Sequence, residues 1–165
     1  MFELTHIYLK SILKYDHETG VFIAIVGRPR VKVGGCVGTI LPNGYVHIMI
    51  RGKFYKGHRL AWFYMTGEWP SEQIDHINGC RSDNSWANLR ECSNSQNSFN
   101  RKKYRNNSTS VTGVYWHKKS ERWAASIDVN RKRINLGYFD SVEDAGKVRR
   151  AAELLYFGEF ARKAA

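Results

Sequence analysis

The sequence predicts an α+β protein built from two modules. Three observations support this: short β-rich runs separated by turn signals in residues 21–56, a segment dense in Asp, His and Asn at 74–97, and alternating strands with a capped helix at 113–160. The 165 residues suffice for one or two small domains, and 42% of them are apolar. The composition therefore excludes a disordered basic tail.

The first module begins with a helix and a β-rich scaffold. Tyr8, Leu9, Ile12 and Leu13 recur at helical spacing until the turn-rich segment 16–20 ends the helix. A meander of short antiparallel strands is expected next, over residues 21–26, 36–40, 45–50 and 53–56. Helical spacing returns in residues 58–67, where His58 is interpreted as a structural or DNA-contacting histidine.

Residues 74–97 form the segment that is able to carry chemistry. Residues 74–77 predict a strand with Asp75 and His76, and residues 89–92 return antiparallel. Neighbouring strand residues face opposite sides, so Asp75 and His76 share one site only where the strand ends or twists. A helix beginning near Gln96, capped by Ser93 or Ser95, would bring Asn97 to them. Asn78, Asp83 and Asn84 are interpreted as turn formers. Arg81 and Arg90 either touch phosphate or form solvated or salt-bridged pairs.

The motifs DH-ING-x-R-x-DN-x-x-x-NLR and SQN in this segment resemble the HNH endonuclease family, within it the phage and intron-encoded homing group that ends in Asn. GVF, GYVHI and HRLAW-x-x-x-TGEWP extend the resemblance over about residues 5–106. It implies a ββα-metal (His-Me finger) nuclease module. The implied roles are His76 as general base, Asp75 and Asn97 as ligands of one Mg²⁺ or Mn²⁺, and Asn88 as the residue that orients His76 and steadies the hairpin.

Phosphodiester hydrolysis requires these residue types for physical reasons. A neutral imidazole can take a proton from water near physiological pH. A carboxylate-bound divalent ion neutralises the charge that gathers on phosphate oxygens, and Asn97 in place of a histidine favours a hard, oxygen-ligated ion over zinc. One base and one ion serve one strand, so we expect a monomer to nick DNA without a small-molecule cofactor.

Residues 113–160 predict three strands and one helix. Trp123, Ala125 and Ile127 alternate with polar or small residues, as in a sheet with one apolar face. Ser141 and Asp144 form a capping box, after which a helical stripe runs to Gly158. That stripe comprises Ala145, Val148, Ala152 and Leu155. The helix is expected to cover the apolar face, and Trp116 is interpreted as a packing residue rather than a base-stacking one.

The motifs GV, WAA-x-I, LG-x-F and DS-x-ED-A in the same segment resemble the ethylene-response-factor (APETALA-type) DNA-binding domain. The resemblance implies that the open face of the sheet lies in the major groove of double-stranded DNA. The implied DNA-facing residues are Tyr115, His117, Lys119, Arg122, Ser126, Asp128, Arg133 and Asn135. Arg131 and Lys132, at a hairpin turn, either contact phosphate or form a plain solvated turn.

The charge is distributed unevenly between the modules. The net charge of the whole chain is +11. Residues 1–100 contain 11 Lys or Arg and 8 Asp or Glu, whereas residues 101–165 contain 15 and 7. This excess favours a polyanionic partner. The predicted domains are a nuclease at 1–100, a basic linker at 101–112 and a DNA-binding domain at 113–165. Within the linker, Arg101, Lys102, Lys103 and Arg105 either track a phosphate backbone or form a solvated tether.

Other features of the sequence narrow the class. No apolar run is long enough for a membrane span, the first residues lack the pattern of a secretory leader, and the three cysteines form no CxxC pair. We expect free thiols and a cytoplasmic location in a bacterial or phage-infected cell. The leading hypothesis is a site-specific DNA endonuclease of the homing type. The alternatives are a non-catalytic DNA-binding regulator and an RNA-binding or intron-processing protein.

Overall fold

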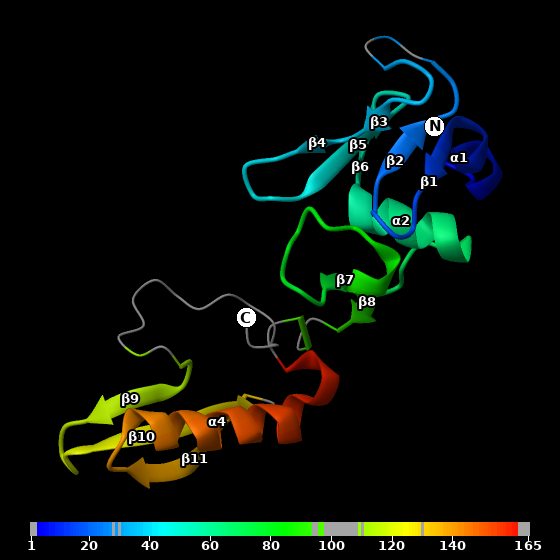
Figure 1. Ribbon diagram of the computed structural model, residues 1–165. Coiled ribbons are helices and arrows are strands. Elements are labelled where there is room, and N and C mark those ends of the chain that lie inside the picture. Colours follow the sequence, from blue (N-terminus) through cyan, green and yellow to red (C-terminus); the bar gives the residue numbers. More distant parts are fainter. Residues whose placement is uncertain are drawn as a thin grey trace. The chain divides into compact units, whose positions relative to one another are not determined.

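A computed structural model describes residues 3–27, 29, 31–93, 96–97, 109, 111–129 and 131–161 (Figure 1). The chain divides into two compact units, Met1–Asn94 and Ser95–Ala165. The predicted α+β class is confirmed: small antiparallel sheets with helices are followed by a three-stranded antiparallel sheet and a helix. The division between the units falls ahead of the predicted boundary at residue 100, and the domain limits remain a prediction.

The first unit consists of small antiparallel sheets with two helices. Its sheets have the strand orders β1-β2-β3, β4-β5-β6 and β7-β8. The elements are α1 (His6–Ile12), β1 (Leu13–Tyr15), β2 (Phe22–Ala24), β3 (Cys36–Val37), β4 (Thr39–Ile40), β5 (Val46–Ile50), β6 (Lys53–Lys56), α2 (Gly57–Thr66), β7 (Gln73–His76), the 3-10 turn η1 (Trp86–Asn88) and β8 (Leu89–Cys92). The predicted order of elements is therefore present.

Two predicted elements end differently from expectation. Leu13 was expected on the first helix, but it begins β1 and pairs with Ala24. The predicted strand 36–40 is split into β3 and β4 at Gly38, whose φ is 135°. A Cβ atom at Gly38 would lie 2.7 Å from Cγ1 of Val46, so the strand bends where only glycine fits.

One hydrophobic core joins α1, α2 and the sheets of the first unit. Its fully buried side chains include Leu9, Leu13, Phe22, Ile48 and Leu60. The buried face of α2 contributes His58 as well as apolar residues. The helix ends at Gly67, which has φ 82° and donates its N–H to the carbonyl of Phe63. Because this face of α2 is buried, the polar side chain of His58 lies in the interior of the unit.

In the second unit, the described residues 111–129 and 131–161 form a three-stranded antiparallel sheet with the helix α4 packed across it (Figure 1). It contains β9 (Val114–His117), β10 (Arg122–Val129), β11 (Lys132–Phe139), α4 (Val142–Phe157) and the 3-10 turn η2 (Gly158–Phe160). Ser141 caps α4 through its Oγ, which accepts a hydrogen bond from the N–H of Asp144 at 3.0 Å. The core contains Val114, Ala125 and Ala145, with Trp123 and Phe139 packed against it.

Some residues of the second unit depart from the sequence prediction. Leu155 is 78% exposed, so it is not a core residue. Trp116 is 47% exposed, but its ring packs edge-on against that of Trp123 at 5.3 Å, as a packing residue would. Arg149 is buried on α4 instead, beside Glu153. Thr109, expected in the linker, is buried and donates its hydroxyl to the carbonyl of Val114 at 2.9 Å. The end of the predicted linker therefore packs with the second unit.

Among the helices in the described part of the chain, none has the length and apolar character needed to cross a membrane. The three cysteines are free thiols, as expected: Cys36 and Cys80 are exposed and Cys92 is buried.

Candidate active site

The β7–β8 hairpin carries both residues that the sequence singled out for chemistry. Asp75 lies opposite Arg90, and His76, the last residue of β7, lies opposite Leu89. Asp75 is 7% exposed and His76 is 4% exposed. Polar side chains buried to this degree need partners, because an unpaired buried polar group costs free energy.

Arg90 supplies the partner of Asp75. Its Nη2 lies 2.8 Å and its Nε 3.1 Å from Oδ2 of Asp75. Both side chains are largely shielded from solvent. Of the two roles that the sequence left open for Arg90, the salt-bridged one is therefore present.

His76 makes a side-chain contact with Asn84. Its Nε2 lies 3.2 Å from Oδ1 of Asn84, which the sequence suggested as a turn former. Asn84 does lie in the loop between the strands, but it is 2% exposed. The dipeptide Asp83-Asn84 indicates a turn, but it does not indicate whether the Asn84 side chain points to solvent or inward. The sequence pattern therefore did not reveal the contact between Asn84 and His76.

Asn88 steadies the loop between β7 and β8. Its Oδ1 accepts a hydrogen bond from the N–H of Asn78 at 2.9 Å, and its Nδ2 donates to the carbonyl of Asp83 at 2.8 Å. Asp83 in turn accepts the hydroxyl of Ser85 at 2.7 Å and the amide of Asn78 at 2.7 Å. These bonds fix the loop; the predicted role of Asn88 in orienting His76 remains a prediction.

The rings of His58 and Tyr45 lie near the candidate base, His76. The ring of His58 lies 5.1 Å from that of His76, at 82°, and Tyr45 lies 5.2 Å from His58. Burial lowers the pKa of His76 below its ordinary value, although the bond from Asn84 acts in the opposite direction. Burial also lowers the pKa of His58, to about 3. Both imidazoles are therefore neutral at physiological pH.

The predicted second metal ligand lies in the other unit. Gln96 and Asn97 are helical and half-buried, as expected for the start of a helix after the hairpin. They belong to the unit Ser95–Ala165, so the pairing of Asp75 with Asn97 remains a prediction. In the described part of the chain, no three or more His, Cys, Asp or Glu residues gather as ligands for an ion. A site made of one carboxylate and one amide oxygen would suit Mg²⁺ or Mn²⁺.

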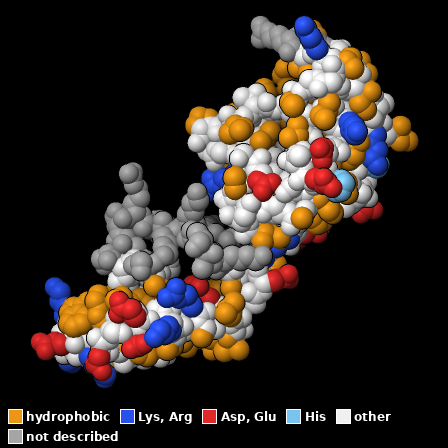
Figure 2. Space-filling model, in the orientation of Figure 1, with side chains coloured by type: hydrophobic (Ala, Val, Ile, Leu, Met, Phe, Trp, Pro, Cys, Tyr) orange, Lys and Arg blue, Asp and Glu red, His pale blue; other side chains and the backbone are white. Residues whose placement is uncertain are grey.

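Most of the predicted DNA-binding residues of the second unit are accessible to solvent. Seven of these residues, Tyr115, Lys119, Arg122, Arg131, Lys132, Arg133 and Asn135, are exposed, and His117 is half-buried. Ser126 is 9% exposed, so little of its side chain is accessible for the predicted contact with DNA. Figure 2 shows that basic side chains lie beside acidic and apolar ones on the visible face of this unit.

Two of the predicted arginines are already paired. Nε of Arg122 lies 2.8 Å from Oδ1 of Asp140, and Arg133 binds both carboxylate oxygens of Asp128 at 2.9 and 3.0 Å. These pairs are exposed, so each contributes little to stability. Arg131, with φ 65°, lies in the turn that joins β10 and β11. The predicted linker residues Arg101, Lys102, Lys103 and Arg105 lie outside the described residues.

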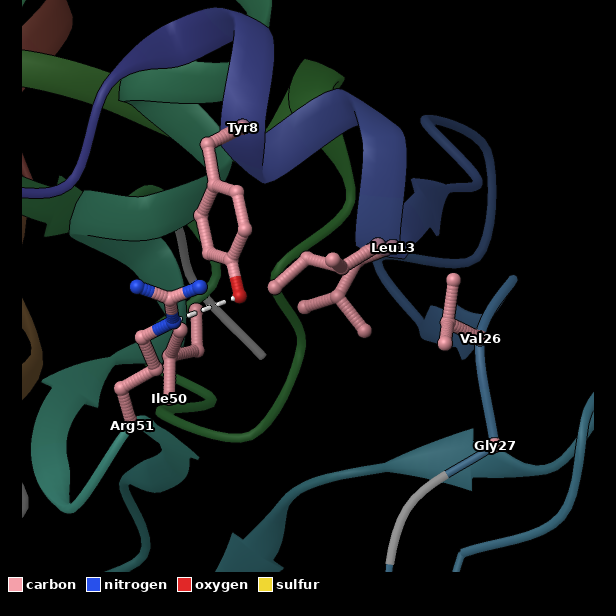
Figure 3. A pocket seen from close by; sticks show the side chains of 7 residues that line it. Tyr8, Leu13, Val26, Gly27, Ile50 and Arg51 are labelled. Carbon is pink, nitrogen blue, oxygen red and sulfur yellow. Dashed lines mark hydrogen bonds between the residues drawn. The ribbon is translucent and has the colours of Figure 1, made fainter.

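A separate cavity of about 310 Å³ lies between α1, β1 and the β5–β6 turn (Figure 3). Nε of Arg51 donates to the hydroxyl oxygen of Tyr8 at 2.9 Å, and the guanidinium lies 4.6 Å from the centre of that ring. The remaining lining residues are Ile12, Leu13, Val26, Gly27 and Ile50. Its walls are mainly apolar, and the Tyr8–Arg51 pair lies at one side.

Comparison with known proteins shows which protein family the β7–β8 hairpin and its neighbouring elements resemble. The HNH endonuclease family matches residues 55–99, which include α2, both strands of the hairpin and Asn97. Protein 3.8 of Escherichia phage T7 is 31% identical over 114 residues, which are 67% of this chain and 93% of the phage protein. The chain belongs to the HNH endonuclease family, and T7 protein 3.8 is its relative.

A solved structure is also similar to this chain. It is that of the HNH homing endonuclease I-HmuI, at 24% identity and a TM-score of 0.38. The similarity covers 50% of this chain and 47% of that enzyme, so the chain spans about half of its length.

Proposed function

We propose that this chain is a site-specific, metal-dependent endonuclease that hydrolyses double-stranded DNA. In this proposal His76 is the general base, and Asp75 and Asn97 bind one Mg²⁺ or Mn²⁺. Asn88 keeps the intervening loop in place. The protein works in the cytoplasm of a bacterial or phage-infected cell, as a homing endonuclease that nicks one strand as a monomer.

The observation that carries the proposal is a neutral histidine held beside a carboxylate at the end of a strand. Burial keeps the imidazole of His76 unprotonated at physiological pH, so it retains a lone pair for a proton. β7 ends at His76, and in this proposal the side chains of Asp75 and His76 serve one site at that end of the strand. Together they provide a base and an anionic ligand within one dipeptide.

The ligand set fits a hard cation. A carboxylate has about four lone-pair positions, so Arg90 on Oδ2 leaves Asp75 able to share its charge with an ion. When bound, the ion supplies positive charge to the phosphate oxygens that become more negative during hydrolysis. Arg90 fixes the orientation of the carboxylate, and His76 takes the proton of the attacking water.

We propose that the second unit binds the target as an ethylene-response-factor-like domain. Its open sheet face offers Tyr115, Arg122 and Asn135 for contact with a groove. Arg131 and Lys132 project near the β10–β11 turn and suit phosphate contacts. The net charge of residues 101–165, with 15 basic and 7 acidic side chains, favours duplex DNA over a neutral partner.

The test is nicking of supercoiled plasmids that carry a library of candidate targets, with Mg²⁺ and with EDTA. Wild type should nick only with Mg²⁺, and His76→Ala should lose about 10²-fold or more of the rate. His47→Ala changes another histidine of the same unit and should keep the activity. Equal nicking by wild type and His76→Ala, or nicking that EDTA does not affect, would overturn the proposal.

A DNA-binding regulator without nuclease activity is the second candidate. The Arg90–Asp75 pair favours it, because a guanidinium on the carboxylate reduces the charge available to a cation. Titration of the full chain with Mn²⁺ separates the two. Binding that Asp75→Asn abolishes supports the endonuclease, whereas no binding by wild type at millimolar Mn²⁺ supports the regulator.

A further inference from the structure

Asn84 lies at the centre of several contacts that the proposed reaction does not yet use. Its side chain is 2% exposed and its Oδ1 lies 3.2 Å from Nε2 of His76. Its backbone carbonyl accepts the hydroxyl of Tyr15 at 2.6 Å. A loop residue with both its side chain and its backbone engaged in this way is held in one position.

The orientation of the Asn84 amide follows from its second contact. Nδ2 of Asn84 points to the carbonyl oxygen of Ser82, at 3.4 Å, and a carbonyl can only accept. The other end of the amide, Oδ1, therefore faces His76. Because Oδ1 also can only accept, the nitrogen of His76 that faces it must carry a proton. Neutral His76 then has its hydrogen on Nε2 and its lone pair on Nδ1.

Two glycines leave room for Asn84 and hold it from either side. A Cβ atom at Gly20 would lie 2.3 Å from the carbonyl carbon of Asn84, and one at Gly57 would lie 2.9 Å from its Nδ2. Gly20 comes from the turn between β1 and β2, and Gly57 begins α2. In addition, the N–H of Trp86 donates to the carbonyl of His17 at 2.8 Å. The N-terminal hairpin and α2 therefore enclose the loop residue that faces His76.

We propose that Asn84 is a positioning residue for His76. Its Oδ1 keeps the imidazole proton on Nε2, which leaves Nδ1 as the atom that accepts a proton from water. The hairpin of β1 and β2 acts on the site through Tyr15 and Gly20, which place Asn84. The chemical part of this inference rests on the proposed function, whereas the tautomer is a property of the folded chain.

The first test is the tautomer of His76 by ¹⁵N NMR of the full chain, at a pH where the ring is neutral. Wild type should show a protonated Nε2 and an unprotonated Nδ1. Asn84→Leu, which has no acceptor, should show a mixture of tautomers. Asn84→Asp, which keeps an acceptor oxygen, should restore the wild-type pattern. Asn78→Leu perturbs the same loop without touching that bond and should leave the tautomer unchanged.

The second test is the rate of plasmid nicking. Asn84→Leu should lower kcat severalfold with KM little changed, because only the fraction of His76 that keeps its lone pair on Nδ1 can accept the proton. Asn84→Asp should recover most of that loss. Unchanged kcat in Asn84→Leu would overturn the inference, and so would a protonated Nδ1 in wild type, a measurement that needs no variant to fold. If wild type does not cut DNA, the proposed function fails while the NMR result still decides the role of Asn84.

Discussion

The guanidinium of Arg90 binds Oδ2 of Asp75 across the β7–β8 hairpin, with Nη2 at 2.8 Å and Nε at 3.1 Å. The two residues are partners in the strand register, so the pair is built by the hairpin itself. It neutralises a carboxylate that is 7% exposed, which would otherwise be a costly charge.

Replacing Arg90 should therefore destabilise the first unit. Arg90→Met leaves Asp75 buried without this partner, and the free energy of unfolding should fall by about 3–5 kcal/mol. Adding Asp75→Asn to it should recover much of the loss. Urea unfolding of both variants measures the effect. As a matched control, Arg133→Met breaks an exposed pair with Asp128 and should cost about 1 kcal/mol or less. Equal losses for the two arginines would contradict this prediction.

Substitution of Gly20 should affect stability and activity together. Gly20→Ala places a methyl group against the backbone of Asn84 and Ser85 at a residue with φ 73°. Gly79→Ala is the control, because Gly79 has φ 71° and nothing within 4 Å of the added Cβ. Gly79→Ala should lower the free energy of unfolding by about 1–2 kcal/mol, because alanine is strained in the left-handed conformation. Gly20→Ala should lower it by about 1–3 kcal/mol more, because the added methyl group also clashes with the backbone. Only Gly20→Ala should also slow nicking; two equal losses of stability would argue against the close packing.

The buried histidine His58 should make the first unit sensitive to acid. Its pKa is lowered from 6.5 to about 3, so the unfolded chain binds a proton that the folded chain rejects. The free energy of unfolding therefore keeps its full value above pH 6.5, and it falls as the pH drops from 6.5 toward 3. Between about pH 7.5 and about pH 5, wild type should lose about 2 kcal/mol more than His58→Phe.

Urea unfolding at the two pH values checks this difference. His17→Phe is a suitable control, because it removes an exposed histidine of the same unit that does not act on the pKa of His58. An identical pH dependence in wild type and His58→Phe would show that His58 is protonated in the folded protein.

DNA affinity should depend on the acidic residue of the open sheet face. Asp128 binds Arg133 through both oxygens, so Asp128→Asn should release the guanidinium and raise affinity for duplex DNA. Arg133→Gln should lower affinity. Lys132→Ala should reduce the slope of log K against log[salt] by about 0.9 if its ammonium neutralises one phosphate. Fluorescence anisotropy with a duplex and a matched RNA at several salt concentrations measures these changes, and a flat salt response would contradict them.

The sequence by itself determined the order of the elements, and it predicted Asp75 and His76 as the dipeptide that carries the chemistry. Strand alternation, turn dipeptides and helix caps are local properties, so the β7–β8 hairpin, α2 and the β9–β11 sheet with α4 follow from short stretches of chain. The resemblance of short motifs to the HNH endonuclease family led to the prediction of Asp75, His76, Asn88 and Asn97 as site residues, and their roles remain predictions.

Tertiary structure decided which side chains meet. Tyr15 and Asn84 are 69 residues apart, yet their hydrogen bond fixes the residue that faces His76. The ring of His58 reaches His76 because α2 buries one face against the sheets. Leu155 fits the helical stripe of α4 but is exposed, whereas Arg149, which is not part of that stripe, is buried. Such contacts depend on how distant elements pack, and no local periodicity encodes them.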